Sequence, residues 1–141
     1  MAGLLVVDTS VLVATERGEL PLDTLSKIQS GVRPAISSIT VSELLHGYHR
    51  AQQESRRLSR ARFIDTLLSE MGVLVFDLEV AREHARIWAD LAERGEMIGP
   101  YDLIIAATAV VHRAPLATSN YKEFQRVRGL EVRPVRLSRK P

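Results

Sequence analysis

The chain has 141 residues, of which 45% are hydrophobic, so we expect one domain over residues 1–141 with a single core. The absence of cysteine excludes disulfide bonds, thiolate zinc sites and cysteine nucleophiles. The net charge is only +2, no signal peptide is visible, and no apolar stretch approaches the roughly 18 residues of a membrane span, so we expect a soluble cytoplasmic protein with no membrane partner.

The N-terminal half of the chain alternates short apolar runs with segments of helical spacing. Gly18 and Gly31 mark helix ends, and Pro21 marks a helix start. The predicted elements are a strand at 4–7, a short helix ending at Gly18, a helix at 21–31, a strand at 35–37, a helix from Thr40 to residue 51 and an amphipathic helix with a basic outer face at 53–71.

The C-terminal half continues this alternation. Residues 101–113 are apolar almost all round, which predicts a central buried helix. The helix at 79–94 is predicted to end at Gly95 and to turn Ala81, Ala85, Trp88 and Leu91 inward. The remaining predicted elements are strands at 73–76, 115–118 and 130–137 and a short helix at 120–127.

Strands that alternate with helices predict an α/β fold with a mostly parallel sheet covered on both faces. In such folds ligands bind at the carboxyl ends of the strands. Asp8 follows the first predicted strand directly, so the question is why a carboxylate stands between two apolar runs.

Four polar residues are placed at these strand ends or in the helices that follow: Asp8, Glu43, Asp102 and Asn120. Taken singly, each fits helix capping, and Thr40 with Glu43 has the spacing of a capping box. Taken together, three carboxylates at one sheet edge would repel one another unless they share protons or a cation. Hard oxygen ligands favour Mg²⁺ or Mn²⁺, which predicts a metal-dependent phosphodiesterase.

Basic residues form two clusters despite the small net charge. Such clusters are either solvated faces, contacts to an acidic partner protein, or an electrostatic footprint for nucleic acid. The first contains Arg50, Arg56, Arg57, Arg60 and Arg62, and the second contains Lys122, Arg126, Arg128, Arg133, Arg136, Arg139 and Lys140.

Three stretches together resemble the PIN-domain ribonucleases, and most of all the VapC-type toxins of toxin–antitoxin modules. They are VVDTSVLVA, SSITVSELLHG and MIGPYDLIIAATAVVHRAPLATSNYKEFQRVRGLEV, in the family's order and spacing. The resemblance implies a three-layer α/β/α sandwich with a central, mostly parallel sheet. It also implies cleavage of RNA that depends on Mg²⁺ or Mn²⁺.

Position by position, the resemblance makes Asp8, Glu43 and Asp102 the catalytic, metal-binding acids. Asn120 takes the place of the fourth acid, where a neutral amide weakens the case for a second ion. Glu123 is interpreted as a surface helix residue that does not compensate. Side chains expected to support the acids are Thr9, Ser10 and Thr118, and side chains expected to contact RNA or an antitoxin are Arg126 and Arg128.

The resemblance further implies a homodimer silenced by a VapB-like antitoxin, with a larger toxin–antitoxin assembly possible. A dimer is also predicted from the helix at 79–94, because Ile87, Trp88 and Leu91 cannot all face the sheet.

The alternative to a ribonuclease toxin is a catalytically weak PIN-like module that binds RNA or a partner. The E-x-x-H spacing of Glu43 and His46 does not indicate a di-iron bundle, because no second such motif exists.

Overall fold

The computed structural model describes residues 3–20 and 31–137. Its centre is a sheet of five parallel strands in the order β3-β2-β1-β4-β5. The strands are β1 (Leu4–Val7), β2 (Arg33–Ser37), β3 (Gly72–Leu74), β4 (Leu116–Thr118) and β5 (Val132–Pro134). The helices are α1 (Thr9–Glu16), α3 (Ser38–Arg50), α4 (Glu54–Glu70), α5 (Leu78–Arg94), α6 (Pro100–Val111) and α7 (Tyr121–Phe124). The helix predicted at 21–31 falls on residues 21–30, outside the described part.

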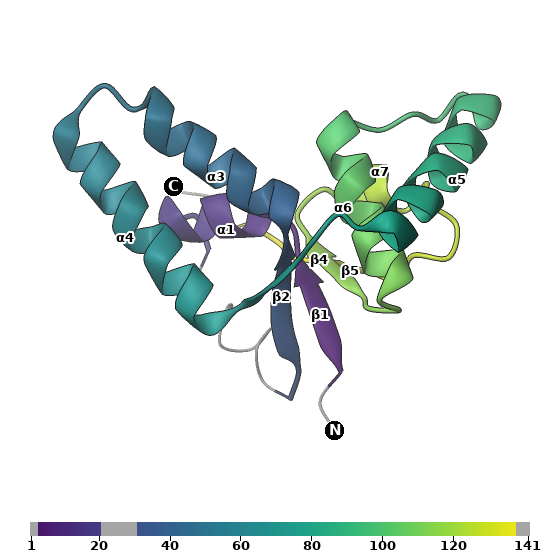
Figure 1. The fold of residues 1–141 in the computed structure, drawn as a ribbon, viewed down its shortest axis with the longest axis horizontal. Helices are drawn as coiled ribbons and strands as arrows, with labels where there is room; N and C mark the ends of the chain where they lie inside the picture. Colours follow the sequence, from purple (N-terminus) through teal and green to yellow (C-terminus); the bar gives the residue numbers. More distant parts are fainter. Residues whose placement is uncertain (1–2, 21–30, 138–141) are drawn as a thin grey trace.

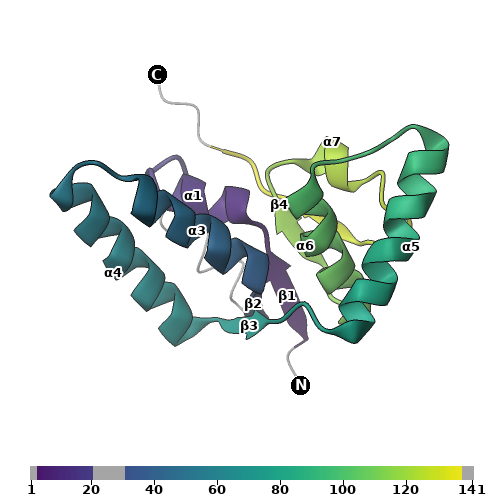
Figure 2. The same cartoon turned by 45° about the horizontal axis from the view of Figure 1, so that its top comes forward.

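The helices cover both faces of this sheet, as Figures 1 and 2 show. Val6 and Val7 are both fully buried but belong to different hydrophobic clusters, because successive strand residues point to opposite faces. The cluster around Val6 includes residues of α5, α6 and α7, and the cluster around Val7 includes residues of α1, α3 and α4. The predicted three-layer α/β/α arrangement is confirmed.

Several element boundaries differ from the predicted ones. The helix predicted to begin at Thr40 begins at Ser38, because the Ser37 hydroxyl caps it by accepting a hydrogen bond from the Ile39 N–H at 3.2 Å. The strands predicted at 73–76 and 130–137 are only three residues long each, since the sheet ends with these edge strands. The buried helix predicted at 101–113 is present as α6, with Ile105, Ala106 and Ala107 fully buried.

One face of α5 was predicted incorrectly. Val80, Ile87 and Leu91 are buried, whereas Trp88 is 54% exposed and Ala85 is also exposed. The inward face of this helix therefore runs through Ile87 rather than through its neighbour Trp88. The helix ends as predicted, at Gly95 with a left-handed φ of 65°, a conformation that glycine adopts without strain.

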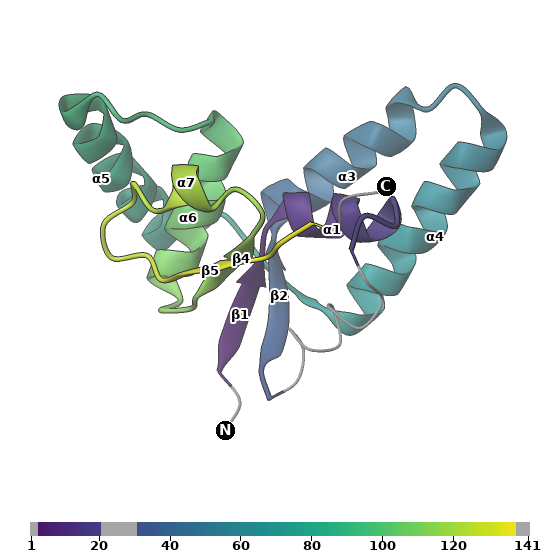
Figure 3. The same ribbon diagram turned by 180° about the vertical axis from the view of Figure 1, so that it is seen from behind.

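The parallel sheet brings the carboxyl ends of β1, β2 and β4 to one edge. The chain runs from β1 outward through β2 and β3 and then returns to add β4 on the other side of β1. This change of direction between β1 and β4 is the topological switch point at which α/β folds bind ligands (Figure 3). Within the described residues, no helix is long and apolar enough to cross a membrane.

Candidate active site at the sheet edge

Asp8 is buried directly after β1, with 1% of its surface exposed. Its Oδ2 accepts hydrogen bonds from the hydroxyls of Ser10 at 2.6 Å and Thr118 at 2.8 Å. Burial raises the pKa of Asp8 above its usual range, although these two hydrogen bonds act to lower it. Asp8 occupies the N-cap position of α1, yet its side chain makes no capping hydrogen bond. The backbone N–H groups of Thr9 and Ser10 also act to lower its pKa, but a capping role alone does not require a carboxylate this deeply buried.

Glu43 lies on α3, the helix that follows β2. The Thr9 hydroxyl donates to Glu43 Oε1 at 2.8 Å and is also hydrogen-bonded to the buried hydroxyl of Thr40 at 3.0 Å. Burial and the nearby charge of Asp8 both raise the pKa of Glu43. The capping-box interpretation of Thr40 and Glu43 is wrong, since α3 begins at Ser38 and both residues lie inside it.

Asp102 brings the third carboxylate to this edge from the first turn of α6. Its pKa is raised to about 7 by burial, by the charge of Asp8, by a hydrogen bond and charge from Glu123, and by the charge of Glu43. Gly99 leaves room for the group, because a Cβ there would lie only 3.3 Å from Asp102 Oδ2. The three predicted acids are therefore close enough to influence one another's charge.

Glu123, which the sequence interpretation favoured as a surface helix residue, lies closer to the acids than that interpretation assumed. It is half-buried on α7, and its carboxyl is near enough to Asp102 to help raise the pKa of that group. The sequence signal for this contact is weak, since Glu123 also fits an ordinary acidic residue in a helix's first turn.

Asn120 lies at the same edge, but its side chain is exposed and makes no capping hydrogen bond. Its backbone N–H donates to the Thr118 hydroxyl at 2.9 Å, and the N–H of Ser119 donates to Ser10 Oγ at 3.3 Å. Thr118 and Ser10 thus connect the segment after β4 to Asp8. The hydrogen bonds expected from Thr9, Ser10 and Thr118 toward the acids are present.

The chemistry of this donor set fits a hard divalent cation. Asp8, Glu43, Asp102 and Glu123 offer carboxylate oxygens, the ligands that Mg²⁺ and Mn²⁺ prefer. Nearby negative charges contribute to the raised pKa values of Glu43 and Asp102. In the part of the chain that the structure describes, no three His, Asp or Glu side chains are already grouped as a ready set of metal ligands. The acids therefore lie near enough to influence one another's charge without being grouped at metal-binding distance.

The raised pKa values predict a pH dependence of stability in the metal-free protein. The pKa of Asp102 is about 7 in the folded protein against 3.8 in the reference state, so the folded state binds this proton more tightly. Stability should therefore increase as the pH falls through 7. We expect the melting temperature to be higher at pH 5.5 than at pH 8 by about 2–4 °C, the effect of roughly 1 kcal/mol in a domain of this size.

Asp102→Asn should flatten this dependence, because an amide does not titrate. Asp65→Asn, the same change at an exposed position on α4, should leave it unchanged. Thermal melts of the three proteins in chelator across pH 5.5–8 provide the measurement. A wild-type melting temperature that is lower at pH 5.5 than at pH 8 would contradict the raised pKa of Asp102.

The first basic cluster is divided by the fold. Arg60 forms a two-pronged ion pair with Glu16, with Nε and Nη2 each 2.7 Å from a carboxylate oxygen. Arg57 donates to the carbonyl of Ala51 at the end of α3. Arg50 and Arg56 line a cavity of about 720 Å³ formed by residues of α1, of α3 and α4, and of the loop between α3 and α4. Arg57 and Arg60 of this cluster therefore hold neighbouring segments together, whereas Arg50 and Arg56 border the cavity.

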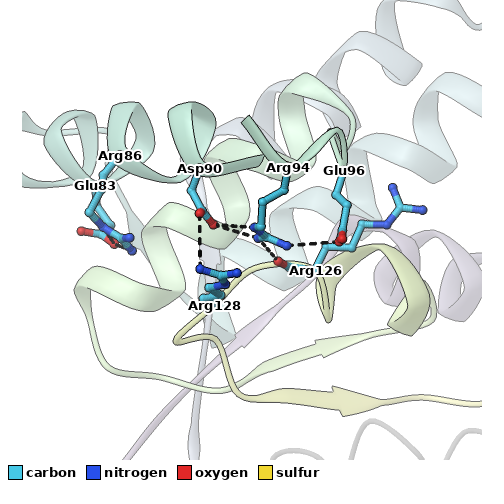
Figure 4. Close-up of polar contacts among 7 residues, drawn as sticks. All are labelled: Glu83, Arg86, Asp90, Arg94, Glu96, Arg126 and Arg128. Atoms are coloured by element: carbon cyan, nitrogen blue, oxygen red, sulfur yellow. Dashed lines mark hydrogen bonds and ion pairs between the residues drawn. The ribbon is translucent and has the colours of Figure 1, made fainter. Parts of the chain in front are cut away.

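Two members of the second basic cluster, Arg126 and Arg128, lie against α5, as Figure 4 shows, whereas Arg139 and Lys140 fall outside the described residues. The Arg94 guanidinium donates to Asp90 at 2.8 Å and to the backbone carbonyl of Arg126 at 2.6 Å, and it holds the pKa of Asp90 below its usual range. Arg126 donates to the carbonyl of Met97 at 3.1 Å. The Arg128 side chain stays 72% exposed, 3.8 Å from Asp90. Of the two predicted contact residues, Arg128 is thus the one left accessible.

A family model described as PIN domain matches residues 5–130 of the chain. The chain is 38% identical over 128 residues to Ribonuclease VapC1 of Rickettsia felis, covering 91% of this chain and 93% of that protein. It is 34% identical over 100 residues to the tRNA(fMet)-specific endonuclease VapC of Salmonella typhimurium, covering 71% and 74% of the two chains.

Among solved structures, the chain resembles one described as VapBC2 from Rickettsia felis bound to a DNA fragment from their promoter. The TM-score is 0.85 at 25% identity, and the match covers 94% of this chain and 99% of that one. The likeness therefore extends over nearly the whole fold.

Proposed function

The chain belongs to the PIN-domain family, among the VapC ribonucleases, and from that premise we propose that it is a metal-dependent endoribonuclease acting as the toxin of a toxin–antitoxin pair. The observation that carries the proposal is the buried Asp8, whose charge contributes to the raised pKa values of Glu43 and Asp102. A buried carboxylate with acidic neighbours is costly to stability. A catalytic role accounts for a carboxylate at this position despite its cost.

In this proposal Asp8, Glu43 and Asp102 hold Mg²⁺ or Mn²⁺, and Asn120 adds a neutral oxygen. The ion would bind the scissile phosphate, stabilise its developing charge and lower the pKa of the attacking water. Thr118 and Ser10 fix the position of Asp8, and Thr9 fixes that of Glu43. Because the pKa of Asp102 is raised to about 7, uptake of the cation would release a proton from this group.

A cleavage assay with RNA in excess over protein separates this proposal from a catalytically weak RNA-binding or interaction module. With Mn²⁺ present, an enzyme cuts many RNA molecules per protein molecule, whereas a binding module leaves the RNA intact. The three acids and their hydrogen bonds favour the enzyme. Intact RNA across several RNA classes would favour the module.

The proposed protein partner is a VapB-like antitoxin, alone or in a larger assembly, and the proposed place of action is the cytoplasm. The support is the similarity to a VapBC2 structure over 94% of this chain.

We propose in addition a homodimer that buries the outer face of α5. Phe76, Leu78 and Trp88 are 45%, 67% and 54% exposed, and the ring centroid of His84 lies 5.6 Å from that of Phe76 and 5.8 Å from that of Trp88. An exposed apolar strip of this kind marks an interaction site. In a two-fold dimer the same patch of both subunits meets at the interface, so a single substitution that adds a charge places two like charges in that interface.

Trp88→Glu should therefore convert a dimer to a monomer. Sedimentation at roughly tens of micromolar without antitoxin provides the measurement, since a specific interface of standard size is populated there. Leu58→Glu, which changes a side chain 50% exposed on α4, should remain dimeric. A monomeric wild-type protein under these conditions would count against the dimer.

Arg128 is proposed to contact an RNA phosphate. Loss of one such contact should weaken binding and reduce the slope of log affinity against log salt concentration by about 0.7 for single-stranded RNA. Filter binding of Arg128→Ala across salt concentrations measures this slope, with Arg86→Ala on α5 as the control. Arg126→Ala is less informative, because Arg126 also holds the Met97 carbonyl. An unchanged slope would assign Arg128 to solvent or to the antitoxin.

A further inference from the structure

A second cavity, of about 310 Å³, lies beside the carboxylates between α3 and α6. It is lined by Ile39, Ser42, Glu43 and His46 of α3 and by Tyr101 of α6. We call it the α3–α6 pocket. Its volume is at the lower end of the range for small-ligand sites, which suits a single planar group better than a peptide segment.

The α3–α6 pocket is continuous with the candidate active site. Glu43 belongs to both, and Tyr101 directly precedes Asp102 in the first turn of α6. A group bound in the pocket would therefore lie next to a phosphate held at the carboxylates. In an RNA chain, the group in that place is the base of a nucleotide flanking the scissile bond.

Tyr101 gives the pocket a surface suited to a base. The side chain is 53% exposed, and no hydrogen bond to its hydroxyl is found within the described residues. His46 adds a second ring, Ile39 an apolar wall and Ser42 a hydroxyl. Proteins recognise unpaired RNA bases by stacking on aromatic side chains and by hydrogen bonds to base edges.

The charge of the pocket excludes a phosphate as its main ligand. The residues that line it include the carboxylate of Glu43 and neither Lys nor Arg. A phosphate or an acidic peptide would be repelled here, whereas a neutral base with amino groups would not. This difference separates the pocket from the basic clusters, which suit the RNA backbone.

We propose that the α3–α6 pocket binds one unpaired nucleobase next to the scissile phosphate, stacked on Tyr101. This inference rests on the proposed ribonuclease function and names a determinant of substrate choice. It implies that the enzyme cuts single-stranded or looped RNA, since a paired base cannot enter the pocket.

The test is a coupling experiment between Tyr101 and the RNA. Cleavage of a single-stranded RNA by the wild type and by Tyr101→Ala is compared with cleavage of the same RNA made abasic at each position flanking the cut. Tyr101→Ala should lower kcat/KM by about 5- to 150-fold, the range for loss of one base–aromatic stack. One abasic substitution should produce a similar loss in the wild type and little further loss in Tyr101→Ala.

Two further variants define the cause of the loss. Tyr101→Phe keeps the ring and should retain activity within about 3-fold, because stacking needs only the aromatic face. Tyr121→Ala removes another exposed tyrosine, 43% exposed, that does not line the pocket, and should cleave normally. Melting temperatures of all variants show whether they are folded.

Three outcomes would overturn the inference while leaving the ribonuclease proposal intact. The first is normal cleavage by Tyr101→Ala. The second is that, at every abasic position, the loss in kcat/KM from the abasic RNA multiplies with the loss from Tyr101→Ala, which means that the two changes act independently. The third is an equal loss of kcat/KM in Tyr121→Ala. A Tyr101→Ala protein that cleaves RNA normally but no longer binds an antitoxin would reassign the pocket to a protein partner. Absence of RNA cleavage by the wild type with Mn²⁺ would instead remove the proposed function, and this inference with it.

Discussion

Asp8→Asn should lose RNA cleavage by at least about 100-fold while remaining folded, the scale expected when a group that stabilises transition-state charge is lost. Asparagine has nearly the same shape as aspartate and caps helices equally well. Its carbonyl oxygen can accept the hydrogen bonds that Ser10 and Thr118 now donate to Asp8 Oδ2. The substitution therefore removes one negative charge and little else. Without metal, the melting temperature should stay the same or rise, since repulsion among the acids decreases.

The matched control is Asp77→Asn at the start of α5. The Asp77 carboxylate accepts a hydrogen bond from the Val80 N–H at 2.9 Å, so Asp77 is a true helix cap. Asp77→Asn should be both stable and fully active, because asparagine keeps this hydrogen bond. If Asp8→Asn behaves in the same way in melting and RNA-cleavage assays, the carboxylate of Asp8 serves the fold and not the chemistry.

Arg60→Leu should lower the free energy of unfolding by about 2–3 kcal/mol, less than the full cost of breaking a buried ion pair because each partner is about a fifth exposed. The guanidinium holds Glu16 of α1 through two hydrogen bonds and the Leu44 carbonyl of α3 at 3.1 Å. Gly47 makes room for it, since a Cβ there would lie 2.2 Å from Arg60 Nη1. Loss of Arg60 leaves the Glu16 charge mostly buried and unpaired, and the melting temperature should fall by roughly 6–12 °C.

Arg62→Leu is the control for this prediction, because Arg62 is exposed on the same helix. It should change stability by no more than about 0.5 kcal/mol. The double variant Arg60→Leu with Glu16→Leu should recover part of the loss, since no charge then stays unpaired. Equal melting temperatures for Arg60→Leu and Arg62→Leu would show that the ion pair contributes nothing.

Local patterns were sufficient to predict the elements that form the sheet and the edge that carries the acids. The apolar run at 4–7 is a buried strand, and the alternation of strands and helices gives a parallel sheet whose carboxyl ends meet. Asp8 is placed by that rule alone. The same rule singled out Glu43 and Asp102, each of which also looks like an ordinary capping residue when taken alone, and the family resemblance then matched them to the catalytic acids.

The features that could not be predicted depend on contacts between residues far apart in the chain. Arg60 looked like part of a basic surface, but its partner Glu16 is 44 residues away. Glu123 looked like a surface residue until the fold placed it beside Asp102. Trp88 and Ile87 are neighbours on a helix, and periodicity alone does not determine which of them faces the sheet.

The measurement that tests a metal-bound carboxylate site most directly is the rate of RNA cleavage as Mn²⁺ is returned to chelator-treated protein, with Mn²⁺ binding followed by calorimetry in the same samples. We expect the wild-type protein to be inactive without metal and its rate to rise in proportion to the bound Mn²⁺. Asp8→Asn should bind the ion weakly and stay slow at every concentration. Full cleavage by the wild type in chelator would contradict a metal-bound carboxylate site. The same Mn²⁺ affinity and the same cleavage rate in Asp8→Asn as in the wild type would also contradict it.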